Sequence, residues 1–131
     1  MKRLIKIFSL TLVLVMFIVT LASCAAPNKD PQKAQRALEK KGYEATLIDG
    51  AIAANQYKGC ESYIVAKDES KDTVLLVYYF RDKSYAKEVW ESLNEETAKE
   101  ALDVSEDTKI VMKNSGKIIY FGIKDAVKAA K

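Results

Sequence analysis

One segment, Thr73–Phe80, constrains the fold of this chain more than any other. It is rich in β-branched and aromatic side chains, which favour strands. Its apolar residues occupy both alternating positions, whereas a strand with one wet face alternates between apolar and polar residues. The segment therefore predicts a central strand that is covered on both faces, or nearly so.

Shorter patterns predict the rest of the sheet. Further strands are expected over residues 43–48, 60–67, 109–113 and 117–122. Residues 68–72 and 114–116 are polar hairpin turns between consecutive strands. Strands joined in this way pair antiparallel. Residues 51–59 are ambiguous between a helical turn and a loop.

Two amphipathic helices are expected on this sheet. Asp30 and Pro31 suit the start of the first helix, and Asp82 suits the cap of the second, which should run to about residue 100. A short final helix is expected over residues 125–131. The predicted fold class is α+β. It consists of an antiparallel sheet of about five strands with two main helices packed on one face, in the order α-β-β-β-α-β-β-α, after an N-terminal signal helix.

The start of the chain has a composition of its own. Three basic residues precede an apolar run from Ile7 to Leu21, and at about 15 residues this run is short of the roughly 20 that span a bilayer core as a helix. Basic residues before the run and small residues after it are typical of a cleaved secretory signal. The alternatives are an uncleaved anchor helix, or ordinary cleavage nearby that leaves Cys24 unmodified.

The residues Leu21-Ala22-Ser23-Cys24 resemble the lipobox of bacterial lipoproteins. The resemblance implies cleavage between Ser23 and Cys24, a diacylglyceryl group on the Cys24 sulfur and often an acyl chain, such as palmitate, on the new amino group. Two or more such chains hold a protein stably on a bilayer. The implied location is the cell membrane, facing outside the cytoplasm, and the covalent lipid on Cys24 is the only group expected in place of a cofactor.

This resemblance divides the chain into three parts. Residues 1–23 are a signal peptide, residues 24–30 a lipidated tether, and residues 31–131 a single small α+β domain. Residues 25–30 are polar and without periodicity, so a flexible tether is expected. It would span about 20 Å when fully extended and keep the domain close to the headgroups.

Charge and residue usage exclude several functions. The chain has 21 basic and 18 acidic residues, and residues 1–23 contain three of the basic ones and no acid. The mature side chains therefore balance, whereas a nucleic-acid binder is expected to be basic. The chain lacks histidine, which excludes Ser-His-Asp and Cys-His catalysis and the usual zinc and copper ligand sets.

Cysteine and carboxylate residues leave some chemistry open. A thioether at Cys24 leaves Cys60 without a partner in the chain, and Cys60 is expected to be buried at a strand start rather than reactive. Residues 95–107 hold six carboxylates but no glycine-containing calcium loop, so a solvated helix end is expected there and no metal site. Two carboxylates can still cleave a glycosidic bond.

Tyrosine is abundant, with seven residues in the chain. Tyr63 and Tyr79 lie on predicted strands and form a candidate binding surface for an envelope protein or peptide, if they share the less covered sheet face. Alternatively, these rings fill the core.

Together these observations predict a membrane-anchored lipoprotein with an extracytoplasmic binding or accessory domain and no catalytic activity. One alternative is a small envelope hydrolase with a carboxylate pair. The other is an inhibitor or immunity-like protein that acts on an external enzyme through a convex loop, such as residues 49–59 or 68–72.

Overall fold

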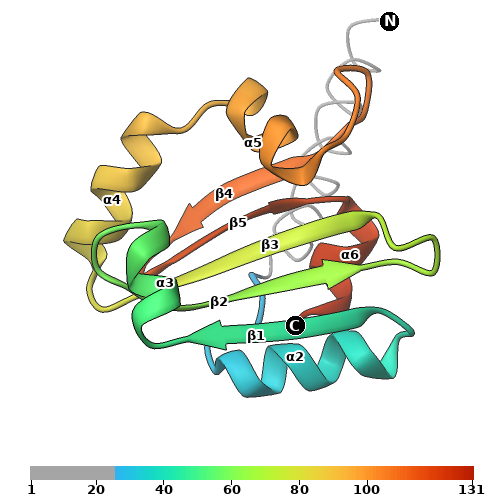
Figure 1. The fold of residues 1–131 in the computed structure, drawn as a ribbon, viewed down its shortest axis with the longest axis horizontal. Helices are drawn as coiled ribbons and strands as arrows, with labels where there is room; N and C mark the ends of the chain where they lie inside the picture. The colour runs from blue at the N-terminus through green and yellow to red at the C-terminus, as the bar shows by residue number, and fades with distance from the viewer. Residues whose placement is uncertain (1–25) are drawn as a thin grey trace, which may run out of the picture.

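The computed structural model describes residues 26–131, which form a five-stranded antiparallel sheet with helices around it (Figure 1). The strand order is β1-β2-β3-β5-β4. The strands are β1 (Glu44–Asp49), β2 (Cys60–Lys67), β3 (Thr73–Phe80), β4 (Val111–Ser115) and β5 (Ile118–Gly122). The helices are α2 (Pro31–Lys40), α3 (Ala51–Gln56), α4 (Lys83–Ser92), α5 (Glu95–Leu102) and α6 (Lys124–Ala129). The α+β class and the antiparallel sheet are confirmed.

Strand β3 lies in the middle of the sheet, between β2 and β5, as its apolar run predicts. Its side chains enter two separate cores. Leu75 and Val77 belong to a core on one face of the sheet, whereas Leu76 and Tyr78 belong to a core on the other. Both faces of the sheet are therefore covered.

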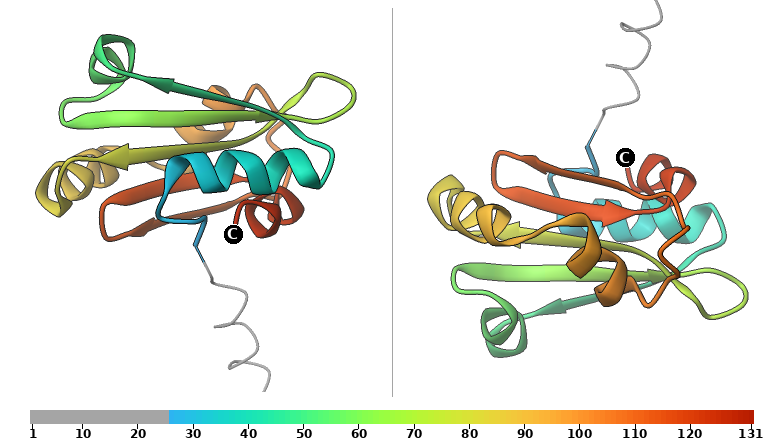
Figure 2. Two further views of the ribbon diagram at one scale, coloured as in Figure 1. Left: turned by 90° about the horizontal axis from the view of Figure 1, so that it is seen from below. Right: turned by 90° about the horizontal axis from the view of Figure 1, so that it is seen from above.

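The helices are divided between these two faces. Helices α2 and α6 pack on one face, through residues that include Leu38 and Val127. Helices α3, α4 and α5 lie on the other, through residues that include Ala86 and Leu102 (Figure 2). This differs from the expectation that the two main helices share a face. The physical reason is that β3 presents apolar side chains on both sides, and each side needs its own cover.

Several local expectations are met, and one helix is divided. Asp30 caps α2 by accepting a hydrogen bond from the Gln32 amide, and Pro31 begins the helix. The helix expected from Asp82 to about residue 100 is two helices. Asn94 starts the second one, α5, through a reciprocal capping box with Thr97. The ambiguous stretch 51–59 contains the short helix α3.

The segment before α2 packs onto the domain. We call residues 26–28 the docked segment. Pro27 is fully buried, the Asn28 amide donates to the Ala130 carbonyl at 2.8 Å, and the Tyr79 hydroxyl donates to the Asn28 carbonyl at 2.7 Å. The expectation of a flexible tether over residues 24–30 is wrong for the docked segment, because its backbone groups and its proline ring have partners in the domain. Residues 24 and 25 lie outside the described part of the chain.

Candidate functional site

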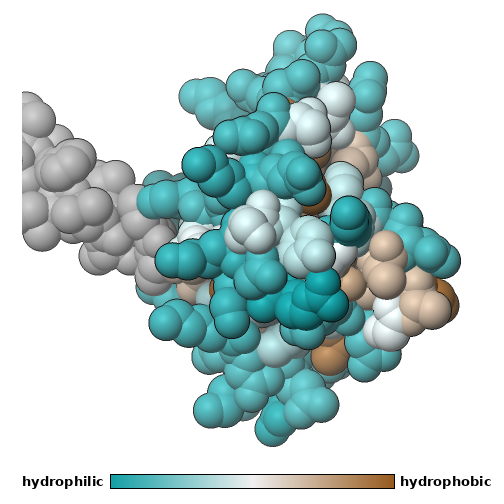
Figure 3. Space-filling model, turned by 90° about the vertical axis from the view of Figure 1, so that its left-hand side faces the viewer, coloured by the Kyte–Doolittle hydropathy of each residue, from teal (hydrophilic) through white to brown (hydrophobic). Residues whose placement is uncertain are grey.

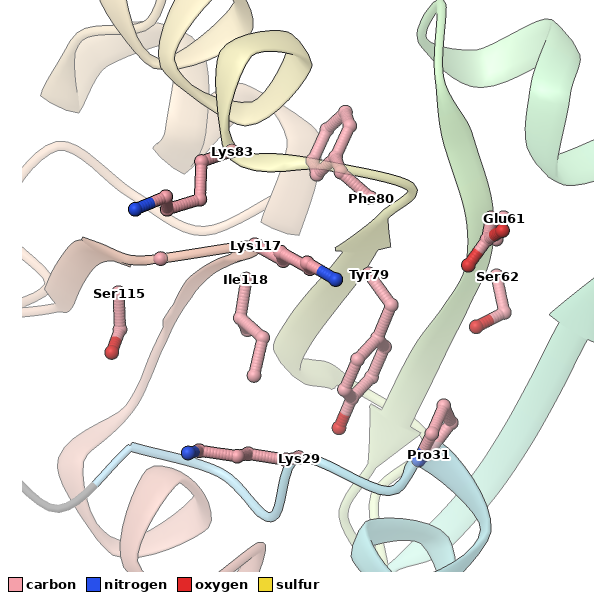
Figure 4. A pocket seen from close by; sticks show the side chains of 11 residues that line it. Lys29, Pro31, Glu61, Ser62, Tyr79, Phe80, Lys83, Ser115, Lys117 and Ile118 are labelled. Carbon is pink, nitrogen blue, oxygen red and sulfur yellow. The ribbon is translucent and has the colours of Figure 1, made fainter.

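A groove of about 650 Å³ lies at the end of the sheet where β2 and β5 begin and β3 ends (Figure 4). The chain at the start of α2, the start of α4 and the β4–β5 turn also line it, so four stretches that are distant in sequence meet there. The groove is lined by Lys29, Pro31, Glu61, Ser62, Tyr79, Phe80, Lys83, Ser115, Gly116, Lys117 and Ile118.

The register of the sheet builds the groove floor. Tyr79 on β3 pairs with Ser62 on β2 and with Ile118 on β5, and Ile118 pairs with Ser115 on β4. Residues directly opposite each other in antiparallel strands point to the same face. These four residues therefore form one cross-strand row, on the face that α2 and α6 cover further along the strands. The Tyr79 ring and Ile118 form the apolar middle of the row, and a serine lies at each end.

Three lysines surround this floor. Lys29, Lys83 and Lys117 are exposed and lie around Ile118 in Figure 4. The ion pairs within residues 26–131 join Lys71 to Glu44 and Lys99 to Glu95, so no groove lysine belongs to either. Glu61 is the one carboxylate among the lining residues. The groove thus has a net positive charge in a domain whose side chains sum to zero.

Among residues 26–131, Ser62 is the one polar residue that is buried, with 7% of its surface exposed. Figure 4 shows its hydroxyl turned toward Tyr79 and the inside of the groove. Its backbone carbonyl accepts a weak hydrogen bond from the Cys60 thiol, but the hydroxyl has no hydrogen-bond partner within residues 26–131. A buried hydroxyl without a partner carries a desolvation cost that a ligand or a water removes.

The docked segment adjoins the groove. A second hollow of about 540 Å³ is lined by residues 26–28 and Lys131, and it shares Lys29, Ser115 and Ile118 with the groove. Tyr79 connects the two features, because its ring lines the groove and its hydroxyl holds the docked segment. Burial, with a smaller contribution from the charge of Asp30, raises the pKa of Tyr79 well above its ordinary value, so this hydroxyl keeps its proton. The chain therefore enters the domain beside the positively charged groove.

The opposite end of the sheet is acidic. A hollow of about 420 Å³ lies where β2 ends and β3 begins, and its lining includes Asp68, Asp72, Asp103 and Asp125. Three of these carboxylates, Asp72, Asp103 and Asp125, are exposed to solvent. The general acid of a glycosidase needs an apolar environment to keep its proton at neutral pH. This hollow does not supply that environment, so it does not favour the hydrolase alternative.

The candidate tyrosine surface is wrong. Tyr63 and Tyr79 are 9% and 6% exposed, and they belong to the two cores on opposite faces of the sheet. The reason lies in the strand register, which places Tyr63 opposite Tyr78 and Tyr79 opposite Ser62. Tyr63 stacks on Tyr78 with ring centroids 5.3 Å apart, so it fills the core. Only Tyr79 reaches the groove.

Cys60 is buried and free of a disulfide, as expected. Burial raises the pKa of its thiol to about 11, although hydrogen bonds with the backbone at Ser62 and Tyr79 act weakly in the opposite direction. The thiol is therefore protonated at neutral pH. Cys60 behaves as a small core residue, because the thiolate is the nucleophilic form.

The acidic stretch 95–107 is held by one lysine. Lys99 forms an ion pair with Glu95 at 3.1 Å and donates to the Glu106 carbonyl at 2.7 Å. Within residues 26–131, no group of three or more potential ligands is arranged to hold a metal ion. Over the same range, every helix is too short or too polar to span a bilayer. Ser23 and Cys24, the expected cleavage and lipidation residues, lie outside the described residues.

Comparisons with known protein families, curated proteins and solved structures find no match for this chain. The groove was not predicted from the sequence. Its residues carry no shared motif, and the only sequence signal for its charge is the spread of lysines over residues 29, 83 and 117.

Proposed function

We propose that this protein is a membrane-anchored lipoprotein whose extracytoplasmic domain binds a partner or ligand at the membrane surface without catalysis. The observation that supports the proposal is the docked segment. Lipidation at Cys24 would leave two residue steps before Ala26, a span of at most about 7 Å. Since Pro27 and Asn28 are held by the domain, the lipid would hold the domain directly against the headgroups.

The groove supports the binding part of this proposal. It is larger than the acidic hollow and the hollow beside the docked segment, it contains a buried hydroxyl, and it opens beside the segment that leads to the anchor. A concave site with an apolar floor and a few polar groups is the common form of a binding site. The groove thus takes the place of the tyrosine surface as the candidate binding site.

The intact mass of the protein extracted from membranes tests the anchor. We expect a chain that lacks residues 1–23 and carries diacylglyceryl and acyl groups. Cys60→Ala is the matched control, because it removes the other cysteine and should carry the same lipid mass. Cys24→Ala should carry none. A soluble species with residues 1–23 attached, or an unchanged lipid mass in Cys24→Ala, would refute the proposal.

A second candidate is an inhibitor or immunity-like protein, which one observation favours. Helix α3 lies within residues 49–59 and contains Ile52, whose surface is 61% exposed. Among residues 26–131, Ile52 is the one large hydrophobic residue that is exposed. Membrane crosslinking tests this candidate. Ile52→Ser should lose a crosslinked partner that the neighbouring control Ala51→Ser retains, and equal crosslinking of the two variants would count against it.

A further inference from the structure

We propose that the groove end of the domain is a second contact with the membrane, in which Lys29, Lys83 and Lys117 bind the phosphates of anionic phospholipid headgroups. This inference rests on the proposed lipid anchor and adds an orientation to it. The groove would face the bilayer, and the acidic hollow would face away from it.

The distribution of charge carries the first step. The three groove lysines are exposed and lie outside the ion pairs of the described residues, and Glu61 alone opposes them in the groove lining. The four aspartates of the acidic hollow lie at the other end of β2 and β3, about 25 Å away along the strands. Charges are screened over about 8 Å at physiological salt. The acidic end therefore does not cancel the charge of the groove lysines, although the total charge is zero. Asp30 and Asp82 adjoin Lys29 and Lys83, but both carboxylates accept hydrogen bonds from the helices that they cap.

The position of the anchor carries the second step. The hollow beside the docked segment and the groove have three lining residues in common, Lys29, Ser115 and Ile118. The docked segment therefore lies at the rim of the groove. A lipid on Cys24 would be at most about 7 Å from Ala26. This short span brings the groove lysines within reach of the headgroup phosphates, and a long flexible tether would not.

Ser62 carries the third step. Its buried hydroxyl points into the groove without a partner in the described chain. It can donate one hydrogen bond to a phosphate oxygen that enters between the lysines.

The surface around the groove favours a headgroup over an apolar protein partner. Figure 3 looks at the end of the molecule where β2 and β5 begin, and this side is mainly hydrophilic, with one apolar area at its right-hand edge and smaller ones elsewhere. A protein interface typically has an apolar centre with a polar rim. Anionic headgroups are instead bound by clustered lysines, each of which contributes roughly a fivefold gain in affinity near a charged surface.

Lysine labelling tests the contact. Full-length protein is purified from membranes, its lipidated mass is verified, and it is reconstituted into vesicles of phosphatidylcholine alone or with phosphatidylglycerol. An amine-reactive reagent and mass spectrometry then report the labelling rate of each lysine. We expect Lys29, Lys83 and Lys117 to be labelled about fivefold more slowly in the anionic vesicles, and this protection to disappear at high salt. Lys41, Lys109 and Lys124 should not change.

Matched variants separate the groove from general charge attraction. One variant carries Lys29→Gln, Lys83→Gln and Lys117→Gln, and its control carries Lys41→Gln, Lys109→Gln and Lys124→Gln, which remove the same charge near the acidic end. Hydrogen exchange of the β4–β5 turn should slow on anionic vesicles for the control but not for the groove variant. Ser62→Ala should fold normally and reduce the slowing.

Each outcome decides the inference. Equal labelling in both vesicles, with the lipidated mass verified, overturns the groove contact and leaves the proposed anchor intact. Protection by inorganic phosphate on phosphatidylcholine vesicles shows a free anion as the ligand and also overturns the contact. A chain without lipid refutes the anchor and the orientation together. Protection that follows phosphatidylglycerol and is lost in the groove variant supports the inference.

Discussion

At the scale of single residues, Cys60 shows how burial controls reactivity. Its folded pKa of about 11 lies two units above the value of 9.0 for a free thiol. At pH 8 the thiolate fraction should therefore be about 100-fold smaller than in the unfolded chain. We predict that iodoacetamide labels Cys60 at least about 100-fold more slowly in the native protein than in urea, as measured by mass spectrometry.

The same shift gives a pH dependence with a defined sign. The folded thiol holds its proton more tightly, so the unfolded chain ionises first as the pH rises. Its contribution to stability is complete below pH 9 and is lost as the pH rises to about 11. Cys60→Ala should remove this part of the alkaline destabilisation. Fast labelling of the native protein at pH 8 would contradict the assignment of Cys60 as a core residue.

Gly122 illustrates a constraint of space rather than of backbone angle. A Cβ at this position would lie 2.7 Å from the Leu75 Cα and would also collide with the Val74 carbonyl oxygen. Backbone atoms of a central strand cannot move aside cheaply. We predict that Gly122→Ala lowers the free energy of unfolding by about 1–3 kcal/mol in urea denaturation.

The control for this change is Gly116→Asn in the β4–β5 turn. Gly116 has φ of +62° and nothing within 4 Å of an added Cβ, and asparagine tolerates this backbone region. The control should change stability by well under 1 kcal/mol. A similar loss in the two variants would show that crowding at Gly122 is not the cause.

At the same scale, the sequence predicted the strands but not which face each residue takes. Tyr63 and Tyr79 were expected together, yet the register pairs Tyr63 with Tyr78 and Ser62 with Tyr79, so the two tyrosines lie on opposite faces. A shift of one position exchanges the two faces of a strand, and a strand that is apolar at every position contains no pattern to fix it.

At the scale of elements, α4 depends on an ionised cap. The Asp82 carboxylate accepts from the Ser84 hydroxyl at 2.6 Å and from the amides of Ser84 and Tyr85. The hydroxyl, with help from the amides, lowers the pKa of Asp82 below its ordinary 3.8. A lowered folded pKa gives stability that is present above about pH 4 and is lost as the pH falls through the folded value.

We therefore predict that α4 frays in acid before the sheet unfolds. Amide exchange at Ser84 and Tyr85 should accelerate below pH 4, and the emission of Trp90, which is half-buried in α4, should shift at the same pH. Asp82→Asn can still accept the amide hydrogen bonds and should remove this pH dependence. If Asp82→Asn keeps the same acid transition, another carboxylate controls it.

The division between α4 and α5 had a local signal, whereas the placement of helices on the sheet had none. Asn94 and Thr97 form a capping box whose residues lie three apart in the sequence, and this pattern can be recognised without a structure. Which face a helix covers depends instead on the direction of its connections. Because β3 can accept helices on both faces, its sequence is compatible with several placements.

At the scale of the whole molecule, the docked segment ties the beginning of the described chain to its centre and its end. We predict that Tyr79→Phe, which removes the hydrogen bond to the Asn28 carbonyl, lowers the free energy of unfolding by about 0.5–1.5 kcal/mol. Hydrogen exchange at Asn28 should accelerate more than exchange in the sheet. Tyr85→Phe is the control, because its hydroxyl only accepts an exposed bond from Arg81. Equal exchange at Asn28 in both variants would contradict the role of Tyr79.

The groove belongs to this scale as well, and this explains why the sequence did not reveal it. Lys29, Glu61, Lys83 and Lys117 come from segments that only the strand order β2-β3-β5-β4 brings to one end. Each lysine taken alone is an ordinary solvated residue. The fold separates the lysines at one end of the sheet from the aspartates at the other. The total charge, by contrast, depends on composition alone.

The docked segment also sets an order of events in time. The Asn28 amide bonds to the carbonyl of Ala130, so this contact cannot form until residue 130 has been synthesised and α6 has folded. Closing so long a loop is slow compared with local turns. During synthesis, the Asn28 amide therefore lacks this partner until the C-terminal helix has formed. Any enzyme that acts on the chain just before residues 26–28 works next to an undocked segment early and next to a docked one later.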